Sequence, residues 1–155
     1  MKYLIILAIL LFGGCSIKHY EHSQSKIIIM KTKALKFADL GYIRNSGNAV
    51  ELELFVAGKT VFKASINHLV CTNEGCMSKA AFNEEYLHVT YPDSLLQNIL
   101  LAQAIYNKTN LLKTDDGFEQ SIQTQDVDIF YKVSRDVTYF KDAKNKILFK
   151  IKETK

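Results

Sequence analysis

Residues 49–66, AVELELFVAGKTVFKASI, carry the clearest structural signal in this 155-residue chain. The first half of the stretch alternates between apolar side chains and the charged Glu51 and Glu53, as a β-strand does when one face is buried and the other is solvated. Gly58 and Lys59 then predict a hairpin turn into a second strand. The stretch therefore predicts an antiparallel sheet with one apolar face.

The same period recurs on both sides of this hairpin. Residues 26–44 are rich in Ile and Lys and alternate in part, and residues 118–122, 127–133 and 147–151 alternate again. A polar turn over residues 142–145 separates the final pair of strands. Strands with a clean polar face are typical of antiparallel sheets that expose one side to water.

Two segments between these strand regions have helical spacing. Residues 78–87 predict a short helix capped by Ser78, and residues 91–105 predict a longer helix opened by Pro92. The order of strands, two helices and strands predicts an α+β fold, in which short helices inserted mid-chain cover the apolar face of the sheet. An apolar stripe at helical spacing on the longer helix is formed by Leu95, Leu96, Ile99 and Leu100.

Residues 1–14 have the features of a secretory signal. Lys2 precedes an apolar run that is too short to span a bilayer, which needs about 20 such residues. The order Leu-Phe-Gly-Gly-Cys at residues 11–15 resembles the lipobox of bacterial lipoproteins, in which the cysteine thiol receives a diacylglyceryl group and the chain is cut just before it. This pattern predicts lipidation of Cys15, and Ser16 after it favours sorting to the outer membrane. The alternative is an ordinary signal peptide with an incidental cysteine.

The lipidation site divides the chain into three predicted parts. These are a signal peptide over residues 1–14, a lipidated and flexible tether over residues 15–25, and a single β-rich envelope domain over residues 26–155 that faces the periplasm. Nine Phe and eight Tyr supply enough apolar volume for a core. The formal net charge is +4, and no basic run with interleaved aromatic side chains occurs, so nucleic acid is not an expected partner.

The remaining two cysteines lie close together in the polar stretch CTNEGC. In an exported protein this pattern predicts a disulfide between Cys71 and Cys76. A metal or redox pair is the first alternative, although four intervening residues do not fit a redox motif and His68 alone does not complete a zinc site. Two free thiols are the second alternative.

No motif for catalysis occurs in the sequence. Signatures of a nucleophile elbow, a zinc protease and a phosphate-binding loop are missing. The acidic pairs Asp115-Asp116 and Glu84-Glu85 fit a solvated turn and a helix surface. The sequence therefore predicts a protein that is not an enzyme and has no cofactor or metal.

Three stretches resemble the LolB family of outer-membrane lipoproteins. Residues 47–64, GNAVELELFVAGKTVFKA, are similar to the family's glycine-containing loop and strand hairpin. Residues 94–105, SLLQNILLAQAI, resemble its lid helix, and residues 139–153, YFKDAKNKILFKIKE, resemble its closing hairpin. Together the similarity extends over roughly residues 40–152.

This resemblance implies an antiparallel β half-barrel, or curved sheet, whose concave apolar face is closed by helices. It implies an outer-membrane protein that takes acylated lipoproteins from a LolA-like periplasmic carrier, binds their acyl chains and helps to insert them in the membrane. The alternative is a closed core in a non-enzymatic envelope or surface lipoprotein, acting as an antigen or a structural subunit of an envelope complex. The implied acyl-chain cavity is lined by Leu52, Leu54, Val56, Phe62, Leu95, Leu96, Ile99 and Leu100.

The resemblance also implies an exposed apolar residue on the loop before the strand of alternating Glu and Leu. Here that loop is GYIRNSGN, residues 41–48, and its apolar residues are Tyr42 and Ile43. Both are expected to contact the membrane if the loop projects from the domain. The alternative is that they alternate as ordinary strand residues, with Ile43 in the core.

Overall fold

The computed structural model describes residues 20–47 and 49–154. The predicted signal peptide and Cys15 lie outside the described residues. The strands within the described ranges are β1 (His22–Lys31), β2 (Lys36–Ser46), β3 (Ala49–Val56), β4 (Lys59–Ile66), β5 (Val70–Thr72), β6 (Gly75–Met77), β7 (Leu111–Thr114), β8 (Gly117–Gln123), β9 (Asp128–Val133), β10 (Val137–Asp142) and β11 (Ile147–Glu153). The helical elements there are α2 (Lys79–Tyr86), α3 (Leu95–Leu100) and the 3-10 turn η2 (Tyr106–Lys108).

All the described strands join in one antiparallel sheet that is not closed, in the order β6-β5-β4-β3-β2-β1-β11-β10-β9-β8-β7. Strands that follow each other along the chain are neighbours, except β6 and β7, which lie at the two edges of the sheet. At the centre β1 pairs with β11, and Ile28 lies opposite Ile151. The sheet therefore consists of an N-terminal half and a C-terminal half that meet at this central pair. The α+β class and the mostly antiparallel, curved sheet predicted from the sequence are confirmed at this level.

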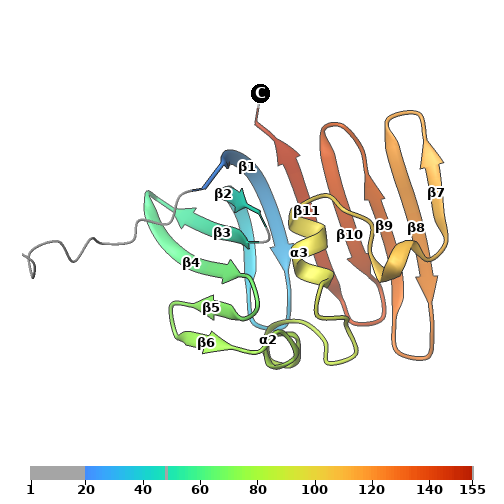
Figure 1. The fold of residues 1–155 in the computed structure, drawn as a ribbon, viewed down its shortest axis with the longest axis horizontal. Helices are drawn as coiled ribbons and strands as arrows, with labels where there is room; N and C mark the ends of the chain where they lie inside the picture. The colour runs from blue at the N-terminus through green and yellow to red at the C-terminus, as the bar shows by residue number, and fades with distance from the viewer. Residues whose placement is uncertain (1–19, 48, 155) are drawn as a thin grey trace, which may run out of the picture.

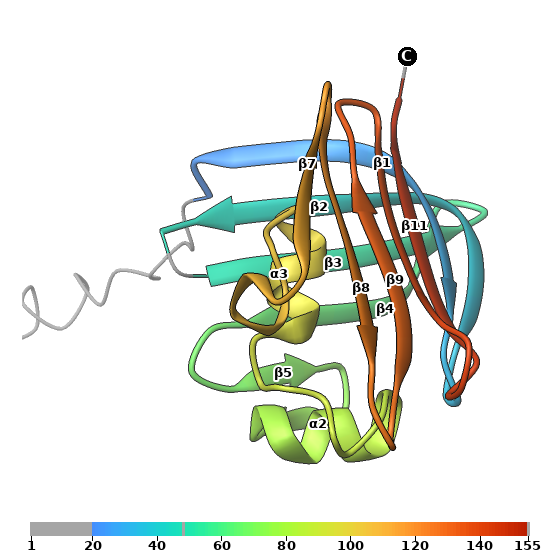
Figure 2. The ribbon, with the colours of Figure 1, turned by 90° about the vertical axis from the view of Figure 1, so that its right-hand side faces the viewer.

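The sheet is strongly bent. Figure 2 shows β1 to β4 running across the direction of β8 to β11, so that the two halves form adjoining walls around a concave side. The helix α3 lies over the concave side, and α2 lies at one end of the molecule near β5 and β6 (Figures 1 and 2). Both helices come from the segment between the two halves, as the element order predicts.

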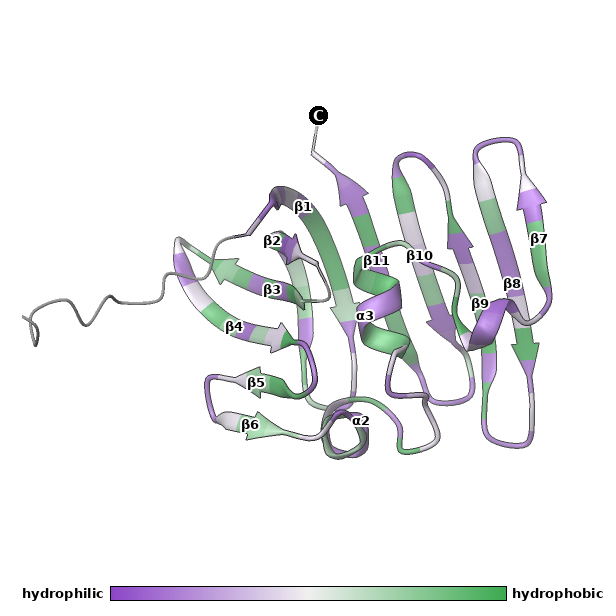
Figure 3. Ribbon diagram, in the orientation of Figure 1, coloured by the Kyte–Doolittle hydropathy of each residue, from purple (hydrophilic) through white to green (hydrophobic). Residues whose placement is uncertain are grey.

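Alternation along the strands makes the concave face apolar. The inward residues of β3, Val50, Leu52 and Leu54, are fully buried, whereas Phe55 is half-buried. Figure 3 shows hydrophobic and hydrophilic residues following one another along the longer strands. The largest fully buried side chains of the C-terminal half, Tyr131, Phe140 and Phe149, complete a core that both halves share.

Two element boundaries differ from the sequence prediction, and the strand-like residues 26–44 are divided by a turn. Residues 26–44 form two strands, because the backbone N–H of Thr32 donates to the Leu35 carbonyl at 2.8 Å and closes a tight turn. The strand β1 begins at His22, inside the predicted tether. The helix predicted over residues 91–105 is α-helical only from Leu95 to Leu100, because Ala102 has a φ of 53° and cannot continue it.

Candidate functional site

The residues predicted to line an acyl-chain cavity do gather under α3, except for Val56. Leu52 and Leu54 of β3 are buried together with the four stripe residues of α3, and Phe62 of β4 is half-buried with its ring 6.1 Å from that of Tyr86. The hollow bordered by Leu52, Phe62 and Leu96 has a volume of about 10 Å³. This volume holds one water at most, so the core under α3 is filled.

The prediction that Val56 lines the cavity is wrong. Its exposed fraction is 48%, although simple alternation places it inward with Leu52 and Leu54. The pairing of β3 with β4 shifts register between Leu54 and Phe55, and this irregularity turns the end of the strand outward.

The prediction that Ile43 is an exposed membrane probe is also wrong. Residues 41–46 of the stretch predicted as a loop belong to β2, and Ile43 is buried opposite Leu52. Tyr42 is the outward neighbour in the alternation, with 39% of its surface exposed on the convex side. Its ring contacts that of Phe55 at a centroid distance of 5.6 Å.

The helix α3 is the middle of a strap, residues 91–109, that crosses the concave side. Its first end is fixed by Tyr91, whose hydroxyl donates to Oδ2 of Asp142 at 2.7 Å. The buried amide of Asn83 also donates to the Tyr91 carbonyl at 3.0 Å. The strap therefore starts from polar anchors on α2 and on the end of β10.

The second end of the strap is fixed by the buried side chain of Gln120 in β8. Its Oε1 accepts from the Ile105 N–H at 2.9 Å, and its Nε2 donates to the carbonyls of Ile105 and Thr109 at 3.0 and 2.7 Å. The hydroxyl of Tyr131 adds a bond to the Gln103 carbonyl at 2.9 Å. Between the two anchored ends, the side chains that α3 turns toward the sheet are apolar.

Burial and hydrogen bonding set the ionisation of the first anchor. Burial alone raises the pKa of a carboxyl group, but hydrogen bonds from Tyr91, Asn145 and backbone amides outweigh it and hold the pKa of Asp142 below its usual value. Burial, followed by the bond to Asp142, raises the pKa of Tyr91. Burial and the negative charge of Asp142 raise the pKa of Tyr106 to about 12. The cluster is therefore a carboxylate among neutral phenols at neutral pH.

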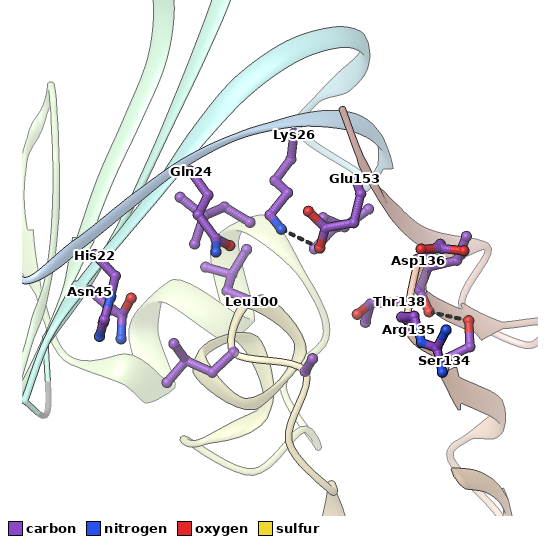
Figure 4. A pocket seen from close by; sticks show the side chains of 15 residues that line it. His22, Gln24, Lys26, Asn45, Leu100, Ser134, Arg135, Asp136, Thr138 and Glu153 are labelled. Atoms are coloured by element: carbon purple, nitrogen blue, oxygen red, sulfur yellow. Dashed lines mark hydrogen bonds and ion pairs between the residues drawn. The ribbon is translucent and has the colours of Figure 1, made fainter. Parts of the chain in front are cut away.

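A larger hollow of about 410 Å³ opens at the other end of α3. Its walls come from the start of β1, the end of β2, the β9–β10 turn and the end of β11, and residues 100–102 lie along it (Figure 4). Ile43, Leu100 and Ile151 supply apolar surface that continues into the core. Volumes of this order are typical of small-ligand sites.

The rim of this hollow is polar and charged. Lys26, a buried residue of β1, forms an ion pair with Glu153 of β11, and both side chains line the hollow. His22 and Asn45 lie on one side of the hollow, and Arg135 lies on the other (Figure 4). The arrangement offers an apolar floor for hydrocarbon and a hydrogen-bonding rim for a polar end group.

Sequence reasoning missed this hollow, since its lining comes from five separate parts of the chain. One signal was present. In β1 the inward positions are Lys26, Ile28 and Met30, so alternation alone places a lysine on the apolar face. A charged residue at an inward position indicates a nearby opening or partner.

The predicted disulfide is confirmed. Cys71 and Cys76 are bonded, with an S–S distance of 2.06 Å, and they face each other across the β5–β6 hairpin. The bond lies at the edge of the sheet and not at the hollow. Among the described residues, no group of three or more His, Cys, Asp or Glu side chains is placed to hold a metal ion. None of the helices in the described ranges has the length and apolar character needed to cross a membrane.

Comparisons of this chain with known protein families, with curated proteins and with solved structures found no match.

Proposed function

We propose that this protein is an outer-membrane lipoprotein of LolB type, which binds the acyl chains of other lipoproteins and helps to insert them in the membrane. The observation that carries the proposal is a short helix, α3, held on the concave side of an open sheet through apolar side chains. In this proposal the sheet is the half-barrel and the strap is its lid. No cofactor and no chemical step are required.

Acyl chains can replace α3 on the sheet because hydrophobic contacts are not directional. The apolar face of the sheet can therefore pack against hydrocarbon as well as against the side chains of α3. Burial of hydrocarbon contributes about 0.8 kcal/mol per CH₂ group. Since the core under α3 is filled, the cargo enters at the 410 Å³ hollow and displaces Leu100 and its neighbours from the sheet. The polar anchors at Asp142 and Gln120 keep both ends of the strap in place meanwhile.

The polar rim of the hollow suits the other end of the cargo. An acylated cysteine carries ester and amide groups next to its hydrocarbon chains, and these groups need hydrogen bonds when they leave water. His22, Asn45 and Thr138 at the rim supply donors and acceptors. A LolA-like periplasmic carrier is the partner that delivers the cargo, and lipid on Cys15 holds the protein at the outer membrane.

The substitution Leu101→Glu tests this function in solution. Leu101 is half-buried and lines the hollow, so a carboxylate there meets any hydrocarbon that enters. With an unlipidated chain, Cys15→Ser, we expect saturable binding of a fluorescent diacylated lipopeptide and at least about tenfold weaker binding by the variant, equivalent to about 1.4 kcal/mol. Leu111→Glu is the control, because Leu111 is also half-buried but lies in β7, away from the hollow.

Failure of the unsubstituted chain to bind the lipopeptide contradicts the LolB-type function. Equal loss of binding in Leu101→Glu and Leu111→Glu contradicts the placement of the site at the hollow. Depletion of the protein in cells gives the matching physiological result. We expect other lipoproteins to accumulate on the periplasmic carrier.

The filled core under α3 favours a second candidate function. A core whose hollow next to Leu96 and Phe62 is only about 10 Å³ suits a non-enzymatic envelope lipoprotein that acts as a surface antigen or a structural subunit of an envelope complex. In that case depletion leaves other lipoproteins correctly located, and the lipopeptide stays unbound.

A further inference from the structure

The convex face of the sheet carries large apolar side chains that the core does not use. Ile27, Leu40, Tyr42 and Phe130 expose 39 to 49% of their surfaces there. Ile27, Tyr42 and Phe130 each lie between two buried neighbours along the strand and therefore point away from the core. Leu40 lies directly opposite Ile27 and points to the same side. We define the convex stripe as Ile27, Ile29, Leu40, Tyr42, Phe55, Phe130, Tyr139 and Leu148.

The members of the convex stripe are neighbours across strands. Leu40 of β2 lies directly opposite Ile27 of β1. The aromatic pairs at the two ends are in contact, Tyr42 with Phe55 at a centroid distance of 5.6 Å and Phe130 with Tyr139 at 6.2 Å. The stripe therefore crosses the sheet from β3 to β9.

Lysines are interleaved with the stripe. Lys150 of β11 lies between Ile29 on one neighbouring strand and Tyr139 on the other, and Lys152 lies opposite Ile27. Within the described ranges, none of the following ammonium groups has a carboxylate within ion-pair distance: Lys31, Lys36, Lys141, Lys150 and Lys152.

The acidic groups on this face are fewer and partly neutralised. Glu51 and Glu53 are paired with Arg44, and Glu119 is paired with Lys132. Asp39 and Asp128 lie near the two ends of the stripe and accept hydrogen bonds from the Leu40 N–H and the Gln123 amide. The middle of the convex face is therefore apolar and positively charged.

We propose that the convex stripe and its lysines bind the surface of an anionic lipid bilayer. Aliphatic and aromatic side chains enter the boundary between head groups and acyl chains, while lysine stems extend their ammonium groups toward lipid phosphates. The charge complementarity is direct, because these lysines are not neutralised within the protein. Apolar side chains and lysines alternate over several neighbouring strands, and no single side chain of the stripe projects far from the surface. Such a surface fits a lipid bilayer.

The position of Tyr20 agrees with this orientation. Its hydroxyl donates to Glu51 at 2.7 Å, so the first described residue is held on the convex side of β3. Four residues lie between Cys15 and Tyr20, so the two are at most about 18 Å apart at full extension. A lipid on Cys15 therefore keeps this face near the bilayer. That step rests on the predicted lipidation, whereas the stripe and its lysines do not.

Vesicle sedimentation of the unlipidated chain tests the proposal. The chain from residue 15 with Cys15→Ser contains all the described strands and the disulfide, and far-UV circular dichroism verifies its fold. We expect binding to vesicles of mixed phosphatidylglycerol and phosphatidylcholine. We expect much weaker binding to pure phosphatidylcholine and a decrease as salt is raised.

Paired variants locate the surface. Leu40→Glu is expected to weaken binding to the anionic vesicles at least about tenfold, whereas Leu69→Glu leaves it unchanged. Leu69 is a matched control for Leu40, since the exposed fractions of the two side chains are 48% and 49% and Leu69 lies in the β4–β5 turn. Lys150→Glu and Lys113→Glu test the charge in the same way. Lys150→Glu is expected to weaken binding to the anionic vesicles, whereas Lys113→Glu, in β7, is its control and leaves binding unchanged.

Two results overturn the proposal. One is an unlipidated chain that stays in solution with anionic vesicles at low salt, and the other is equal loss of binding in Leu40→Glu and Leu69→Glu. Lipopeptide binding distinguishes this failure from failure of the LolB-type function, because Leu40 lies on the opposite face of the sheet from the hollow. Leu40→Glu is therefore expected to bind the lipopeptide as the unsubstituted chain does.

Discussion

Asp142 lies at the end of β10 and is fully buried, yet its surroundings favour the ionised carboxylate. Its Oδ2 accepts hydrogen bonds from the Tyr91 hydroxyl and the Asn145 amide, at 2.7 and 2.8 Å. Its Oδ1 accepts from the backbone N–H groups of Asp128, Lys144 and Asn145, at 3.2, 3.0 and 3.1 Å. All these partners are donors, so the site is built for an ionised carboxylate. The strap, the β10–β11 turn and the start of β9 meet at this one side chain.

Asp142→Asn is expected to lower the free energy of unfolding by about 2 to 4 kcal/mol at neutral pH, because an amide directs its own donors at donors. The pKa of Asp142 is lowered in the folded protein. Its stabilising contribution is therefore fully present above the unfolded value of about 3.9 and is lost as the pH falls through the lower folded pKa. Urea unfolding at neutral and acidic pH should show the difference from wild type shrinking on acidification. Asp115→Asn, in an exposed turn, is the control, and a difference that does not change with pH contradicts the charged role.

At the scale of elements, the sequence predicts what is encoded locally. The alternation in β3, β4, β9 and β11 identifies these strands, because one buried face imposes a period of two residues. Ser78 is a correct prediction as a cap, since its Oγ accepts from the Ala81 N–H at 3.1 Å. Strands β5 to β7 are too short to show a period and form only through pairing with their neighbours.

The end of α3 shows why the rest was not predictable. The apolar spacing continues past Leu100, but Ala102 and Asn107 adopt positive φ because Gln120 and Tyr131 hold the following backbone against the C-terminal half. These partners lie far along the chain. The prediction of Ile43 as a membrane probe was wrong for a related reason. The strand β2 continues through Ile43 because it pairs with β3, which the local sequence does not show.

Gln120→Leu tests whether the second anchor holds the strap. Leucine fills a similar volume but leaves the buried Ile105 N–H and C=O without their partner, a cost of about 2 to 3 kcal/mol. We expect lower stability to urea and faster hydrogen exchange of the strap amides than of β1 and β11. Gln123→Leu, an exposed position in the same strand, should change stability by less than about 0.5 kcal/mol. Uniform loss of protection over the whole sheet means that Gln120 has no local role.

At the scale of the whole molecule, the first and last strands of the sequence, β1 and β11, pair at the centre of the open sheet. Lys26 lies opposite Glu153 in this pairing, so the first and last described strands join the two halves. The large hollow forms where the halves and the end of α3 meet. Its lining is brought together by the pairing of β1 with β11 and not by any local sequence pattern. The sequence therefore predicts the strands but not the hollow.

The two halves have one core because α3 contacts both. Leu96 borders the small hollow with Phe62 of the N-terminal half and Phe149 of the C-terminal half, and Leu100 borders the large one with Ile43 and Ile151. Removing apolar volume from α3 therefore weakens both halves at once. The expected result is one cooperative transition at lower denaturant and not two.

Ile99→Ala tests this coupling. Ile99 is fully buried in α3, and truncation of such a side chain costs about 2 to 5 kcal/mol. Far-UV circular dichroism and tyrosine fluorescence should report the same shifted midpoint, because neither half keeps its core once α3 is loosened. Val89→Ala is the control, since Val89 is 63% exposed and its truncation should cost less than about 0.5 kcal/mol. Two separated transitions in Ile99→Ala would mean that each half of the sheet is stable alone. In that case α3 could leave the sheet, as the proposed lid does, without unfolding the two halves.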